Sequence, residues 1–107
     1  QQLTHAFATE YQLTLNKPSE ESLRNLSRRI FSSIRNNKEE SFVSGHIFIS
    51  VNQDIDDEGF MVAEVTNVQN GQSVLFDIPA ASSPNGDILV DCELIAMNLR
   101  VACERLN

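Results

Sequence analysis

Two hydrophobic stripes mark the C-terminal end of the chain. One stripe repeats at spacings of four and three residues and consists of Ile88, Cys92, Ile95, Leu99, Ala102 and Leu106. The other repeats in the same way and consists of Val90, Leu94, Met97 and Val101. At about 100° per residue, the stripes lie on nearly opposite faces of one helix over residues 87–106. Because an ordinary surface helix buries one face, the second stripe predicts a second packing partner, either within the domain or in another polypeptide.

Earlier in the chain, the pattern predicts one helix and four strands. Residues 3–15 alternate between apolar and polar positions, as in a half-buried strand. A helix follows, with Ser19 as its N-cap, its end near Asn36 and one apolar face formed by Leu23, Leu26, Ile30 and Ile34. Further strands are predicted over residues 42–51, 60–69 and 72–78. In the first of these, Val43, Gly45, Ile47, Ile49 and Val51 share one side.

This element order, β-α-β-β-β-α, predicts an α+β fold. We expect one mostly antiparallel four-stranded sheet with both helices on one of its faces. A length of 107 residues suits a single domain over residues 1–107.

The dipeptide Asn70-Gly71 predicts a two-residue hairpin turn of type I′. In that register, paired residue numbers add to 141, and Glu64 lies directly opposite Asp77. Two carboxylates across a ladder repel each other, so either the pKa of one of them would be raised or a cation would lie between them. The pair is therefore the candidate for a general acid/base pair or half of a metal site in a small enzyme. The alternatives are a solvated strand edge or a slipped register.

Charge is strongly segregated along the sequence, and the formal net charge is −7. Residues 17–38 carry a charge of +4, whereas residues 39–99 contain 11 acidic side chains and neither Lys nor Arg. An acidic body repels nucleic acid and anionic lipid, and it favours partners of complementary charge, including a basic protein.

Cysteine usage and hydropathy predict a cytoplasmic protein. Cys92 and Cys103 are 11 residues apart in the predicted helix, which separates them by about 16 Å at a rise of about 1.5 Å per residue. They are too far apart for a disulfide, so a reducing compartment is the simplest interpretation. No apolar run reaches the roughly 20 residues of a membrane span, and the first residues lack the pattern of a signal peptide.

No motif for catalysis, cofactor binding or metal binding stands out. The acidic loop at residues 54–59 has the oxygen ligands of a calcium loop, but an EF-hand needs Glu where Val65 stands. His5 and His46 have no other ligand at metal-binding spacing, and the four glycines are scattered. We therefore expect no cofactor and no metal, and we expect that the protein is not an enzyme.

The first helix carries a basic flank formed by Arg24, Arg28 and Arg35, which could contact phosphates or an acidic partner. The element order resembles that of small ribosome-hibernation factors, and its last five elements resemble the layout of double-stranded-RNA-binding domains. This resemblance in order and length implies an RNA- or ribosome-associated factor. Since residues 39–99 have no basic side chain, nucleic acid is the less favoured partner.

These observations together predict a small acidic, non-catalytic protein-interaction domain, acting as an adaptor or as an inhibitor of the immunity-protein type. We expect a homodimer whose interface is formed by Val90, Leu94, Met97 and Val101. Acidic residues begin the last helix and Arg100 and Arg105 lie near its end. Two antiparallel copies would therefore place unlike charges together. The competing hypotheses are coverage of this stripe by the first helix, RNA binding by that helix, and an enzyme using Glu64 and Asp77.

Overall fold

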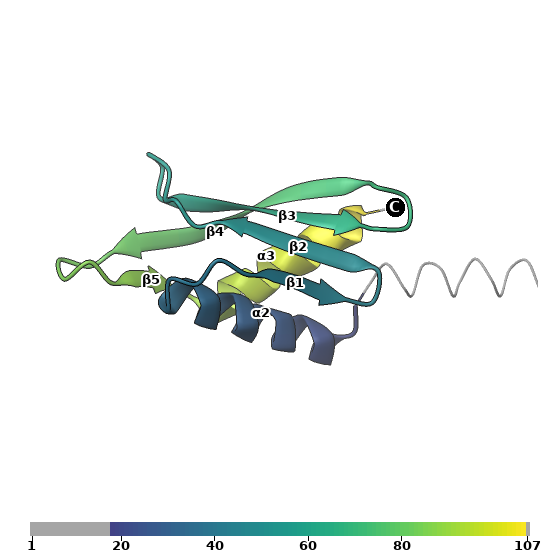
Figure 1. Cartoon of the computed structure of the whole chain (residues 1–107), viewed down its shortest axis with the longest axis horizontal. Helices are drawn as coiled ribbons and strands as arrows, with labels where there is room; N and C mark the ends of the chain where they lie inside the picture. The colour runs from purple at the N-terminus through teal and green to yellow at the C-terminus, as the bar shows by residue number, and fades with distance from the viewer. Residues whose placement is uncertain (1–17, 107) are drawn as a thin grey trace, which may run out of the picture.

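A computed structural model describes residues 18–106, which form two helices and five strands. In chain order the elements are α2 (Glu20–Arg35), β1 (Ser41–Ser44), β2 (Ile47–Asn52), β3 (Phe60–Asn67), β4 (Ser73–Ser82), β5 (Ile88–Val90) and α3 (Cys92–Arg105). The strands form one curled antiparallel sheet in the order β1-β2-β3-β4-β5 (Figure 1). The predicted α+β class is confirmed, but this part of the chain has five strands. The strand predicted at residues 3–15 lies outside the described residues.

One face of the sheet and both helices enclose the hydrophobic core. Every second residue of the central strands is buried, and the largest of these side chains are Ile47 and Ile49 of β2, Met61 and Val65 of β3, and Phe76 and Ile78 of β4. They belong to one cluster with Leu26 and Ile30 of α2 and Leu99 of α3. The expectation that both helices pack on the same face is therefore consistent with the structure.

The helix α2 begins and ends where the sequence indicates. The Ser19 hydroxyl accepts a hydrogen bond from the Ser22 amide at 3.1 Å, which satisfies an amide that has no partner within the helix. Glu20 and Glu21 occupy the first turn, where negative charge interacts favourably with the helix dipole. Asn36 is the C-cap.

The strand predicted over residues 42–51 is instead the hairpin of β1 and β2. Gly45 has a φ of 59°, which a glycine first in a two-residue turn adopts without steric cost, and Ser44 then pairs with Ile47. Because the chain reverses here, Phe42 and Ile49 face the core together. Val43 lies on the opposite face of the sheet, contrary to the prediction that it shares a side with Ile47.

The hairpin between β3 and β4 has a four-residue loop, and the predicted two-residue turn is wrong. The Asn67 amide donates to the Gln72 carbonyl at 2.8 Å, and the Gly71 amide donates to the Asn67 carbonyl at 2.8 Å. The resulting register is two residues from the predicted one, so Glu64 lies opposite Leu75 and Asp77 opposite Val62. A shift of two keeps every side chain on its predicted face but separates the two carboxylates.

The last helix begins at Cys92, five residues later than predicted. Residues 88–90 form β5 and pair with residues 80–82 of β4, after a turn in which the Ser83 amide donates to the Asp87 carbonyl at 2.8 Å. Asp91 then caps α3, and its carboxylate accepts from the amides of Glu93 at 2.8 Å and Leu94 at 3.4 Å. The strand β5 therefore takes the place of the first turn of the predicted helix.

Replacement of the α3 cap, Asp91→Ala, is expected to lower the free energy of unfolding by about 1 kcal/mol, because two amides lose their acceptor. Urea titration followed by circular dichroism measures this change. Asp91→Asn is the matched control and should cost only a few tenths of a kcal/mol, because asparagine is an equally good N-cap. Equal losses in the two variants would contradict this role of Asp91.

Candidate interaction surface

The helix α3 has one buried face and one exposed face. Its buried side chains are Ile95, Ala96, Leu99, Ala102 and Cys103. On the other face Leu94 is 37% exposed, Met97 53% and Val101 45%. These three residues follow the spacing of one helical stripe, and we call them the α3 stripe. The structure thus places three of the four predicted interface residues together.

The fourth predicted interface residue, Val90, lies elsewhere. It belongs to β5, pairs with Ala80 and is half-buried against the hydrophobic core. Because its backbone is extended, Val90 does not follow the helical spacing that the prediction assumed. Val90 is therefore not part of the α3 stripe.

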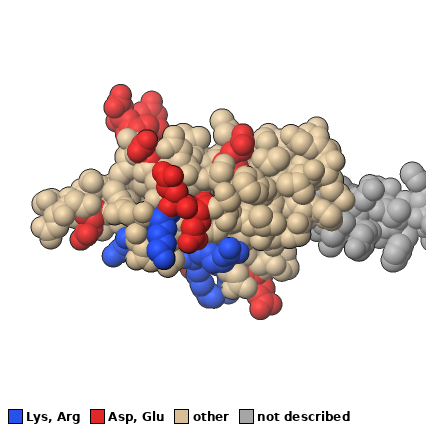
Figure 2. All heavy atoms as spheres, in the orientation of Figure 1, with Lys and Arg blue, Asp and Glu red and all other residues tan. Residues whose placement is uncertain are grey.

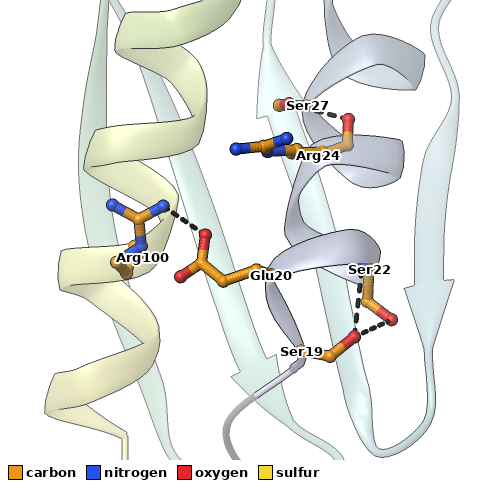
Figure 3. Close-up of polar contacts among 6 residues, drawn as sticks. All are labelled: Ser19, Glu20, Ser22, Arg24, Ser27 and Arg100. Carbon is orange, nitrogen blue, oxygen red and sulfur yellow. Dashed lines mark hydrogen bonds and ion pairs between the residues drawn. The ribbon is translucent and has the colours of Figure 1, made fainter.

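The helix α2 packs against the flank of α3 and leaves the α3 stripe exposed. At this contact the Arg100 guanidinium of α3 donates to the Glu20 carboxylate of α2 at 2.6 Å (Figure 3). The Glu20 side chain is 63% exposed, so solvent screens this pair and its contribution to stability is small. Coverage of the α3 stripe by α2, the main alternative to an external partner, is not what the structure shows.

Two of the three residues of the predicted basic flank line a cleft between the two helices. Arg24 and Arg28 of α2 line it with Met97 and Arg100 of α3, and the Arg24 side chain points toward α3 (Figure 3). The acidic Glu93 lines the same cleft. In Figure 2 the basic side chains gather where α2 runs, with acidic ones directly beside them. The charge of this surface is therefore mixed.

Arg35, the third predicted basic residue, lies near the far end of α2. Its guanidinium lies 5.8 Å from the centre of the Phe31 ring, in a cation–π contact. Arg29, which the predicted set omitted, lies 5.4 Å from the centre of the Phe42 ring. The basic side chains of α2 consequently do not form one continuous phosphate-binding row.

A second groove runs between β4 and α3. It has a volume of about 350 Å³ and is lined by Phe60, Leu75, Phe76, Asp77, Asn98, Val101, Ala102 and Arg105. The Asn98 side-chain amide of α3 donates to the Asp77 carbonyl of β4 at 2.8 Å, which ties the helix to the strand. Leu75 is 63% exposed on the outer face of the sheet. This groove was not predicted from the sequence.

The remaining candidate residues do not form a reaction centre in the described part of the chain. The observed register overturns the Glu64/Asp77 pair. In the acidic loop, the Asp56 carboxylate accepts from the amides of Glu58 at 2.9 Å and Phe60 at 3.0 Å, so it organises the turn into β3. Residues 18–106 contain no group of three His, Cys, Asp or Glu side chains placed to hold a metal ion. His46 lies in the turn between β1 and β2, and His5 lies outside the described residues.

The two cysteines are both free thiols, as the sequence predicts. Cys92 is half-buried, and its sulfur lies 3.7 Å from the Ser27 hydroxyl. Burial, with a smaller contribution from the nearby Glu104 carboxylate, raises the pKa of the Cys103 thiol to about 11. Since the thiolate is the nucleophile, Cys103 is an inert core residue at neutral pH.

Comparison with known protein families, with curated proteins and with solved structures finds no match to this chain. Neither described helix is long and apolar enough to cross a membrane.

Proposed function

We propose that this chain is a small, non-catalytic protein-interaction domain that forms a homodimer through the α3 stripe. The observation that carries the proposal is the exposure of three large apolar side chains, Leu94, Met97 and Val101, on one face of a helix whose other face fills the core. Fully burying such a side chain contributes about 1.5–3 kcal/mol relative to exposure. Because each of the three is already about half-buried, a partner that covers them gains about half of that value per side chain, or about 2–4 kcal/mol in all.

Charge at the ends of α3 supports a second copy as that partner. Asp91 and Glu93 lie at the start of the helix and Arg105 in its last turn. Arg100 is already paired with Glu20, whereas Arg105 has no ion pair within residues 18–106. An antiparallel pair of α3 helices brings Arg105 toward the acidic start of the other copy, and the same contact repeats by two-fold symmetry.

The acidic body of the dimer suits an adaptor, or an inhibitor that binds a basic protein surface. The formal net charge of −7 per chain favours association with partners of opposite charge. It also disfavours nucleic acid, which supports a protein partner over RNA.

Sedimentation of the double variant Leu94→Asp/Met97→Asp tests the dimer. We expect the wild-type chain to sediment at twice its mass of 12.0 kDa. The double variant should sediment as a monomer, because buried unpaired carboxylates at the interface are strongly unfavourable.

The matched control is Leu89→Asp/Val43→Asp. These residues are 48% and 59% exposed, but they lie in β5 and β1, outside the α3 stripe. The control should keep the dimer mass, and circular dichroism should show that both variants are folded. A wild-type monomer, or a folded double variant of unchanged dimer mass, would refute the proposal.

A further inference from the structure

Among residues 18–106, part of one side of β4 carries backbone hydrogen-bonding groups that no strand pairs with. The Ala80 amide donates to the Gly59 carbonyl at 2.9 Å, and the Gln72 carbonyl accepts from Asn67 at 2.8 Å. The even-numbered residues of β4 therefore bond toward β3. Because bonding direction alternates along a strand, the amide and carbonyl groups of Ser73, Leu75 and Asp77 point away from β3. Within residues 18–106, β5 covers this side of β4 only at residues 80–82.

The uncovered stretch of β4 is residues 73–77, and we call it the open edge. Its residues 75–77 line the groove between β4 and α3. The groove places Leu75 of β4 near Val101 and Arg105 of α3. The Asp77 carbonyl accepts one hydrogen bond from the Asn98 side chain at 2.8 Å, and a carbonyl oxygen has a second lone pair for the amide of a paired strand. An exposed strand edge of this kind is a template for pairing with another strand, and proteins usually cover or twist it to prevent aggregation.

We infer that the open edge pairs with the open edge of a second copy, so that the dimer contains one continuous antiparallel sheet across its two-fold axis. This inference rests on the proposed dimer and specifies how it is built. The register that suits the side chains centres the axis on Leu75, so that the two Leu75 side chains meet. Each Ser73 then faces Asp77 of the second copy, where its hydroxyl can donate to the carboxylate. No like charges face each other in this arrangement.

Continuity with the α3 stripe supports a second copy as the occupant of this groove. Val101 belongs to the α3 stripe and also lines the groove, so a partner seated on the open edge reaches that stripe at the same time. A two-fold axis beside Leu75 relates the two α3 helices as antiparallel neighbours on one face of the joined sheet. The edge and the stripe thereby form one self-complementary surface.

Replacement of Leu75 by proline tests the backbone contact. In Leu75→Pro the amide that would bond across the axis is absent, and both copies lose it. We expect the dimer dissociation constant, measured by sedimentation equilibrium, to rise by about 100-fold or more. Pairing with β3 should persist, because proline is tolerated where its nitrogen points away from the neighbouring strand. Pro79 already occupies such a position in β4.

The matched control is Leu75→Thr, which also removes the exposed leucine but keeps the amide. It should stay dimeric. A folded Leu75→Pro variant with wild-type affinity would overturn the edge pairing. If Leu94→Asp/Met97→Asp is monomeric at the same time, the proposed dimer still stands. A monomeric wild-type chain would overturn both.

Cross-linking gives a second measurement that is independent of how well the proline variant folds. In a Cys92→Ser/Cys103→Ala background, Leu75→Cys should be joined to its own copy by a short thiol-specific cross-linker, because paired residues lie about 5.5 Å apart between Cα atoms. Val43→Cys, which is similarly exposed but lies on β1, should remain uncoupled. Equal coupling of the two variants, or none of Leu75→Cys, would contradict the inferred register.

Discussion

Replacement of Phe42 by alanine is expected to lower the free energy of unfolding by about 3–5 kcal/mol, measured by urea titration. Phe42 is the largest fully buried side chain of the described residues and is only 1% exposed. It fixes the four-residue strand β1 to the core, where it lies in the same hydrophobic cluster as Ile30 and Ile49. Its ring also stacks with the Arg29 guanidinium at 5.4 Å, a contact that alanine cannot make.

The neighbouring residue supplies the control. Val43→Ala should change stability by no more than about 0.5 kcal/mol, because this side chain is 59% exposed on the outer face of the sheet. The pair of variants also decides between two arrangements of residues 42–51. A single strand with Val43 and Ile47 on the same side would make Val43→Ala the costly change. The hairpin turn at Gly45 makes Phe42→Ala the costly one.

Much of this fold is predictable because the helices and central strands obey simple periodicities. The inner faces of α2 and α3 follow from the sequence, since apolar residues spaced three and four apart are typical of a helix that buries one face. Ser19 is predictable as the N-cap because a serine followed by two glutamates is typical of a helix start. The predicted sides of β3 and β4 are also correct, despite an error of two in the register.

The errors arose where short turns decide the path of the chain. Residues 42–51 alternate continuously through Gly45, so the pattern gives no sign of the reversal that moves Val43 to the opposite face. The Asn70-Gly71 dipeptide favours a two-residue turn, but hydrogen bonds from Asn67 and Gly71 close a longer loop. Residues 88–90 fit a helical stripe by spacing alone, and only their pairing with β4 shows that they are extended.

The candidate surface is therefore predictable in part. The spacing of Leu94, Met97 and Val101 is sufficient to expect an exposed second stripe on α3. The open edge of β4 could not be found in the same way, because it depends on the order of the strands and on their register. Pro79 also indicates the end of a strand when its partners are unknown, which hides the extension of β4 that pairs with β5. Once the register is known, the Pro79 nitrogen points away from β3, and the strand continues to Ser82.

Alkaline pH is expected to destabilise the protein through Cys103. Burial, and to a lesser extent Glu104, raises the pKa of its thiol from 9.0 to about 11 in the folded chain. A raised pKa means that the folded state favours the protonated thiol. The resulting stabilisation is fully present below about pH 9 and is lost as the pH rises toward about 11. A difference of about two pKa units corresponds to a loss of about 2–3 kcal/mol over that interval.

Comparison of the wild type with Cys103→Ala isolates this effect from the titration of every other group. Alanine leaves a small cavity, so the variant should be less stable at pH 8, where the thiol is protonated in both states. Because alanine does not ionise, the difference between the two proteins should shrink as the pH rises toward about 11. Free energies of unfolding from urea titrations at several pH values measure this convergence. Parallel pH dependence in the two proteins would show that the Cys103 thiol ionises as readily in the folded chain as in the unfolded one.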